Sequence, residues 1–264
     1  LHYEYYKAGA NIIKTNTFGA LSIKFPLNLE KIITSAIQNA NNARNQIQKE
    51  NQNSDKNEYF IAYDISSTGK LLKPLGDLDF EDAVNIFKKS FNIALKQKID
   101  CILIETMNDG YETKAAVLAA KESLQENKID LPIFVTNVYD SDARLLSGAT
   151  PESMVAMLEG LGVDAIGINC SLGPEQMLPV VSKLSKVSSL PIIVNPNAGL
   201  PRVQNGKTVF DVEPTEFVQT MEQIVELGAC VIGGCCGTNP TYIKELTQKL
   251  SNAKIQPITQ KNLS

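Results

Sequence analysis

The sequence predicts an α/β protein of the (β/α)8 TIM barrel class that lacks the first strand of the barrel. Short apolar runs recur along the chain, and a longer segment with helical spacing of its apolar residues follows each run. The runs are apolar throughout instead of alternating, which is typical of parallel strands buried on both faces. At 264 residues, 43% of them hydrophobic, the chain is long enough for one large domain of this class.

Seven of these runs are expected to form strands, at 11–18, 59–66, 100–107, 132–139, 164–171, 191–198 and 230–237. Helices are expected after them, for example at 80–97, 113–125, 151–161, 175–186 and 214–228. Residues that favour helix starts lie at the beginning of three of these segments: Asp79 and Thr150 directly before theirs, and Pro214 as the first residue of its own. Glycines fall where two of the helices should end: Gly160, Gly162 and Gly228. Strand and helix therefore alternate along most of the chain.

The chain opens with a helix-like segment at 3–9, which in a barrel would follow the first strand. Seven strands are one short of eight, so we expect the first strand upstream of Leu1 and interpret the sequence as truncated. A barrel without one strand exposes two edges, and we expect the chain to be poorly active until that strand is restored. A doubly wound open sheet is the alternative, disfavoured because polar residues end nearly all seven runs. We expect the barrel to span 1–251, and the polar segment 252–264 to be a linker-like tail.

Charge and hydropathy exclude several classes of partner. A net charge of −4 and an isoelectric point near 5.2 provide no basic surface for nucleic acid or for an acidic membrane. No apolar run reaches the roughly 18 residues that cross a bilayer. The N-terminus has no basic start followed by an apolar stretch, so it does not resemble a signal peptide, and a cytoplasmic location is expected.

Cysteine placement indicates a possible metal site. Five cysteines without a secretion signal favour metal binding or free thiols over disulfides. Three of them, Cys170, Cys235 and Cys236, end two predicted strands, and the strand ends of a barrel converge on one mouth. Three thiolates suit zinc and leave its fourth position open, as in catalytic sites. Small-residue packing in the GGCCG turn, or a phosphate loop formed by its glycines, are the alternatives. Cys101 and Cys230 lie at strand starts, where inert thiols are expected.

Five strings carry a resemblance to a known family: KTNTFGA (14–20), ILIETM (102–107), GINCSLGPEQ (167–176), NPNAGLP (195–201) and VIGGCCGTNP (231–240). They resemble the homocysteine S-methyltransferase family, with the closest likeness to the homocysteine-binding domain of cobalamin-dependent methionine synthase. The resemblance covers nearly the whole chain in the family's order and spacing. Its most specific element is GINC followed, 65 residues after its cysteine, by the first cysteine of GGCC.

The resemblance implies both a reaction and its residues. Zn2+ would be bound by the three motif cysteines, and the thiol of homocysteine would be methylated to methionine. It also implies that Glu105 binds the amino group of homocysteine, that Asn16 and Thr17 contact the substrate, and that Asn197 occupies the fourth zinc position in its absence. Methylcobalamin is the implied methyl donor, carried with folate by further cobalamin- and folate-binding domains of the same polypeptide.

Some features depart from the family or stay open. The family's first-strand Asp has no counterpart, Lys14 stands where the family often has Glu or another polar residue, and the roles of Asp64 and Asn137 are not assigned. A homocysteine methyltransferase with another donor, or one fused to a methylenetetrahydrofolate reductase, is the first alternative. A non-catalytic zinc-binding barrel is an alternative of another class, and a phosphate-binding aldolase-like barrel is a third.

Overall fold

The computed structural model describes residues 1–51, 58–204 and 206–261. The chain divides into two compact units, Leu1–Phe134 and Val135–Ser264, which are referred to as unit 1 and unit 2. Among the described residues, no helix is both long and apolar enough to cross a membrane.

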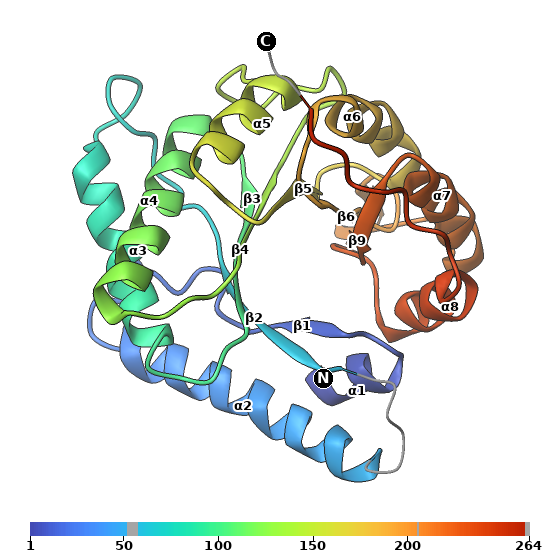
Figure 1. Ribbon diagram of the computed structural model, residues 1–264, viewed down its shortest axis with the longest axis horizontal. Helices are drawn as coiled ribbons and strands as arrows, with labels where there is room; N and C mark the ends of the chain where they lie inside the picture. The colour runs from blue at the N-terminus through green and yellow to red at the C-terminus, as the bar shows by residue number, and fades with distance from the viewer. Residues whose placement is uncertain (52–57, 205, 262–264) are drawn as a thin grey trace. The chain divides into compact units, whose positions relative to one another are not determined.

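Unit 1 is built from parallel strands that alternate with helices. Its strands are β1 (Ile12–Lys14), β2 (Phe60–Ile65) and β3 (Cys101–Met107), and its helices are α1 (His2–Lys7), α2 (Leu29–Glu50), α3 (Phe80–Ala94) and α4 (Gly110–Asn127). Strand β1 pairs with β2 from Ile12 opposite Phe60, and β2 pairs with β3 from Ala62 opposite Cys101. In Figure 1 the helices α2, α3 and α4 lie along the outer side of these strands.

The core of unit 1 forms where helices present apolar stripes to the strands. Helix α2 buries Ile33, Ile37 and Ala40, whose spacing of three and four residues places them on one helix face. The fully buried ring of Tyr63 in β2 meets Phe91 of α3 edge to face, with ring centroids 6.1 Å apart. The strands are held from the helix side by these contacts.

Unit 2 repeats the same alternation. Its elements are α5 (Pro151–Gly160), β5 (Ala165–Asn169), α6 (Pro174–Val187), β6 (Ile192–Asn195), β7 (Arg202–Gln204), β8 (Lys207–Val209), α7 (Pro214–Glu226), β9 (Ala229–Ile232) and α8 (Pro240–Leu250). Strand β5 pairs in parallel with β6, and β6 with β9. Strand β4 (Ile133–Asn137) spans the division between the units, and the seven-stranded sheet follows the chain order from β1 through β6 to β9.

Helix starts and ends occur where the local sequence signals predicted them. Thr150 precedes α5, and its hydroxyl accepts a bond from the backbone N–H of Ser153, whose side chain completes a capping box. Gly162, just beyond the end of α5, adopts a φ of 68°, a left-handed conformation that glycine reaches without strain. All seven expected strands are present in the described residues, although β1 is shorter than its apolar run.

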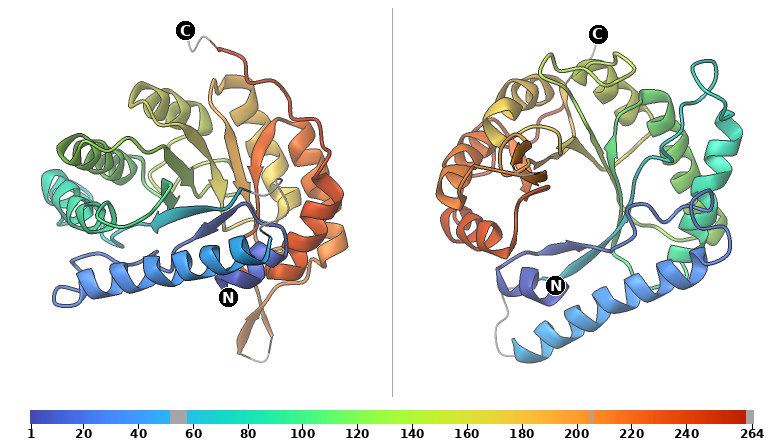
Figure 2. Two further views of the ribbon diagram at one scale, coloured as in Figure 1. Left: turned by 60° about the horizontal axis from the view of Figure 1, so that its bottom comes forward. Right: turned by 180° about the vertical axis from the view of Figure 1, so that it is seen from behind.

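The two-stranded antiparallel hairpin of β7 and β8 was not predicted from the sequence. It pairs Arg202 with Val209, and Figure 2 shows it projecting from the rest of unit 2. The dipeptide Asn-Gly at 205–206 is a hairpin signal that could have indicated it. After α8, residues 252–261 form no helix or strand, and the backbone N–H of Lys261 donates to the Ser189 hydroxyl at 2.8 Å. The end of the expected tail, 262–264, lies outside the described residues.

Candidate metal and substrate site

Three thiol groups meet in unit 2. Cys170 directly follows β5, and Cys235 and Cys236 follow β9. Their sulfur atoms all lie within 4.8 Å of one another, and the Sγ atoms of Cys170 and Cys236 are 3.9 Å apart. Of the residues that the structure describes, these three are the group of His, Cys, Asp and Glu side chains close enough to share one ion.

The loop after β6 holds the two cysteine-bearing loops together. The backbone N–H of Cys170 donates to the carbonyl of Asn195 at 3.0 Å, and that of Cys235 donates to the carbonyl of Pro196 at 2.8 Å. Asn197 accepts a bond at Oδ1 from the backbone N–H of Cys236 at 3.1 Å. The sulfur positions therefore depend on backbone contacts among three consecutive parallel strands.

The glycines of GGCCG are required by close packing. A Cβ added at Gly234 would lie 2.5 Å from the Thr238 hydroxyl oxygen, and one at Gly233 would lie 2.7 Å from Oδ1 of Asn195. Thr238 in turn donates its hydroxyl to the carbonyl of Cys235 at 2.7 Å. These contacts account for both glycines without a bound phosphate.

The backbone at the first cysteine is in an unusual conformation. Cys170 has φ 61° and Ser171 has φ 63°, in the left-handed region that non-glycine residues seldom adopt. Such positions cost on the order of 1–3 kcal/mol each and cluster at functional sites. The pairing of β5 with β6 holds the chain before this turn, and the backbone N–H of Asn197, which donates to the carbonyl of Leu172 at 3.0 Å, holds it after the turn.

The surroundings of Cys170 and Cys236 shift the pKa values of their thiols in opposite directions. A hydrogen bond with Cys235 is the main cause that lowers the pKa of Cys170 to about 6. Burial, and then the charge of Cys170, raise the pKa of the Cys236 thiol. Asn169 also directs its Nδ2 toward the Sγ of Cys235, at 3.9 Å. A thiolate therefore forms more readily at Cys170 than at Cys236.

The donor set fits a zinc ion. Zinc–sulfur bonds of about 2.3 Å in a tetrahedron place the sulfur atoms about 3.8 Å apart. The 3.9 Å separation of the Cys170 and Cys236 sulfur atoms matches that value, and the Cys235 sulfur lies within 4.8 Å of both. Three soft thiolate donors favour zinc over hard cations such as Mg²⁺.

Asn169 also contributes to the site, although its place at a predicted strand end gave it no assigned role. Its side chain is fully buried and accepts a bond at Oδ1 from the Thr136 hydroxyl at 2.7 Å, while its amide nitrogen faces Cys235. The signal for it was its place at the end of β5, directly before Cys170. Asn137, at the end of β4, is also buried.

A second polar cluster lies in unit 1. The Lys14 ammonium, at the end of β1, is 2.7 Å from Oε2 of Glu105 in β3. Asp64 of β2 is buried beside them, and burial together with the charge of Glu105 raises the pKa of Asp64 well above its ordinary value. The Lys14–Glu105 ion pair thus lies next to a carboxyl group whose surroundings favour its uncharged form.

Thr17 is buried and Asn16 is exposed, both in the turn after β1 and not in the strand. The Thr17 hydroxyl donates to the backbone carbonyl of Asp64 at 2.6 Å and lies 2.6 Å from the Thr15 hydroxyl. Thr15 accepts from the backbone N–H of Asp64 at 3.0 Å. The Thr17 hydroxyl thus holds the turn onto β2.

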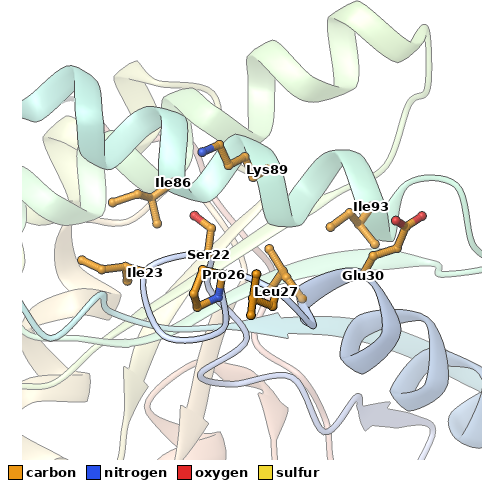
Figure 3. A pocket seen from close by; sticks show the side chains of 9 residues that line it. Ser22, Ile23, Pro26, Leu27, Glu30, Ile86, Lys89 and Ile93 are labelled. Carbon is orange, nitrogen blue, oxygen red and sulfur yellow. The ribbon is translucent and has the colours of Figure 1, made fainter.

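A cavity of about 560 Å³ lies elsewhere in unit 1, and none of the predicted site residues lines it. Figure 3 shows α3 side chains on one side of it and the loop that leads into α2 on the other. Its lining consists of Ser22, Ile23, Pro26, Leu27, Leu29, Glu30, Ile86, Lys89 and Ile93. The cavity has both polar and apolar lining groups, and no cysteine lies among them.

Residues 1–250 match the family model described as homocysteine S-methyltransferase. The methionine synthase of Mycobacterium leprae (strain TN) is 31% identical over 248 residues, which cover 93% of this chain and 20% of that protein. The methionine synthase of Mycobacterium tuberculosis (strain ATCC 25618 / H37Rv) is 29% identical over 256 residues, covering 96% and 21%. The chain thus spans about a fifth of the length of these relatives.

Solved structures match the same extent of the chain. The metallated form of the homocysteine methyltransferase MmuM from Escherichia coli aligns with a TM-score of 0.76 at 22% identity, covering 94% of this chain and 82% of that one. Its apo form aligns with a TM-score of 0.71. At this identity the likeness concerns the fold, and it confirms the predicted α/β class of a (β/α)8 barrel short of one strand.

Proposed function

The chain belongs to the homocysteine S-methyltransferase family, and we propose that it methylates the thiol of homocysteine to give methionine, with Zn2+ held by Cys170, Cys235 and Cys236. The observation that carries this proposal is the meeting of three sulfur atoms within 4.8 Å, from two strand ends distant in the sequence. A zinc ion in such a site lowers the pKa of a thiol ligand, so that the thiol is ionised at neutral pH.

The chain's own residues supply positioning and charge. The pKa of the Cys170 thiol is lowered to about 6 whereas that of Cys236 is raised, and the left-handed turn at 170–171 fixes the direction from which the Cys170 sulfur is presented. Asn169 and Asn197 hold the neighbouring cysteines by hydrogen bonds to Cys235 and to the backbone of Cys236. We further propose that Asn197 fills the fourth zinc position when substrate is absent.

Glu105 is proposed to bind the amino group of homocysteine. It is a buried carboxylate, and in its ion pair with Lys14 it accepts a charged hydrogen bond from an ammonium group. Asn16 and Thr17 are proposed to contact the substrate beside it. Since the Thr17 hydroxyl is bonded to the Asp64 carbonyl, Thr17 would act by shaping the turn, and Asn16 would make the direct contact.

The methyl group must come from an activated donor, because a carbon–sulfur bond forms as the donor's bond to methyl breaks. We propose methylcobalamin, supplied by further cobalamin- and folate-binding domains, on the basis of the similarity to methionine synthases five times longer than this match. Another donor, or fusion to a methylenetetrahydrofolate reductase, is the runner-up within the same reaction class. A cytoplasmic location remains a prediction.

The test compares cysteine variants of the zinc-loaded chain. Cys170→Ser and Cys236→Ser should reduce bound zinc well below one ion per chain. They should also lower the rate of homocysteine methylation, with methylcobalamin as donor, by more than about a hundredfold. Mutation of residues that only hydrogen-bond to metal ligands already lowers metal affinity or activity by about 10–100-fold, and loss of a ligand should cost more. Cys230→Ser is the matched control: its thiol is half-buried and outside the cluster, so zinc content should not change.

X-ray absorption at the zinc edge separates the proposal from a non-catalytic zinc barrel. Adding homocysteine should increase the number of sulfur neighbours of the ion by one if the site takes part in the reaction. An unchanged spectrum under saturating homocysteine would contradict the proposed activity and favour the structural alternative.

A further inference from the structure

Three adjacent strands of unit 1 each contribute a charged or ionisable side chain to one face of the sheet. By register, Lys14 lies opposite Ala62, and Asp64 lies opposite Leu103. Residues two apart on a strand share a face, so Lys14, Asp64 and Glu105 lie on the same face. The ion pair of Lys14 with Glu105 thus crosses β2, with Asp64 beneath it.

The two charges of this pair are unequally accessible. The Glu105 side chain is only 5% exposed, whereas the Lys14 side chain is 32% exposed. A ligand that approaches the buried carboxylate therefore meets the lysine ammonium as well. Burial and the charge of Glu105 raise the pKa of Asp64 and so favour its uncharged form, and its Oδ1 has no hydrogen-bond partner among the described residues.

Charge balance then restricts what can bind. An amine alone would add a second positive charge to a neutral and largely desolvated pair, which is unfavourable. An α-amino acid brings an ammonium and a carboxylate together and leaves four alternating charges with no net excess. The ion pair is therefore complementary to a zwitterionic head group.

We propose that Lys14 is a specificity-determining residue that binds the α-carboxylate of the amino acid substrate while Glu105 binds its ammonium. The inference rests on the proposed function, because it assigns a partner to the other end of the same substrate. It also gives a role to Lys14, which departs from the residue expected at this position in the family.

Calorimetric titration of the zinc-loaded chain with two ligands tests this assignment. The ligands are homocysteine and 3-aminopropane-1-thiol, which has the same thiol and ammonium but no carboxylate. The unmodified chain should bind homocysteine about ten- to a hundredfold more tightly, the range expected for a charge-assisted hydrogen bond. Lys14→Met should reduce this preference to within about threefold, by weakening homocysteine binding without weakening the binding of the amine.

Two further variants guard against a loss of structure. Lys14→Arg keeps the positive charge and should retain the preference for homocysteine. Lys73→Met is the matched control, since Lys73 pairs with Asp79 at 2.9 Å on the exposed surface of the same unit and should not alter either affinity. The preference of the unmodified chain is itself informative should Lys14→Met fail to fold.

Several outcomes would overturn the inference. If Lys14→Met weakened the binding of both ligands equally, Lys14 would only position the Glu105 carboxylate and would not bind the carboxylate of the substrate. Tighter binding of both would mean that Lys14 competes with the substrate for Glu105. An unmodified chain that binds homocysteine without preferring it over the amine would overturn the role of Lys14 and leave the proposed function standing, whereas absence of homocysteine binding would remove both.

Discussion

At the scale of single residues, Asp64 links the site in unit 1 to the pH dependence of stability. Its folded-state pKa is raised, so the native protein keeps a proton that the unfolded chain releases above pH 4 or so. The free energy of unfolding should therefore fall as pH rises from about 4 toward the folded pKa. Asp64→Asn cannot ionise, and its stability relative to the unmodified chain should increase over this range, by roughly 1–3 kcal/mol. Urea denaturation at pH 4, 6 and 8 measures the stability difference between Asp64→Asn and the unmodified chain. The exposed control Asp77→Asn should show no such pH-dependent difference from the unmodified chain. Identical pH profiles for Asp64→Asn and the unmodified chain would contradict it.

At the scale of elements, the approach of β5 to β6 depends on a residue without a side chain. A Cβ added at Gly167 would overlap the backbone of Ile193, so Gly167→Ala must separate the two strands whose ends carry Cys170 and the Asn197 loop. We expect a loss of about 3 kcal/mol or more in the free energy of unfolding, with weaker zinc binding. Gly160→Ala, at the end of α5, meets no atom within 4 Å and should change stability by less than about 1 kcal/mol. Urea denaturation with zinc titration compares them, and equal effects of the two substitutions would refute the packing argument.

At the scale of the whole molecule, a metal held by cysteines 65 residues apart in the chain should stabilise unit 2 selectively. A ligand that binds only the native state adds about 2.7 kcal/mol at a hundred times its dissociation constant. Removing zinc with a chelator should therefore lower the melting temperature and speed amide exchange at 170–172 and 233–238. In unit 1, the segment at 67–70 is held by the buried Glu112 carboxylate through Ser67 and Thr68 and should keep its protection. Hydrogen exchange followed by mass spectrometry measures the protection of each segment. A loss of protection that is equal in both units would contradict a metal site confined to unit 2. Cys170→Ser should not respond to the chelator.

How well a feature could be predicted from the sequence depended on how far apart its interacting residues lie in the chain. Apolar runs marked all seven strands, and Thr150 marked the start of α5, because each signal is contained within a few neighbouring residues. The β7–β8 hairpin was missed although Asn-Gly marks its turn, since its strands are short and mostly exposed and have no apolar pattern. The role of Thr17 in holding the turn to β2 could not be predicted, because its partner, the Asp64 carbonyl, is 47 residues away.

The sequence by itself determined the order of strands and helices and the identity of the three candidate sulfur donors, because strand ends follow from local hydrophobicity and cysteines are read directly. Only the tertiary structure decided that these sulfur atoms lie within reach of one ion, and that Glu105 is paired with Lys14. Both depend on strand register and side-chain conformation between segments 65 or more residues apart. Such contacts are set by the packing of the folded chain, and no local pattern of residues specifies them.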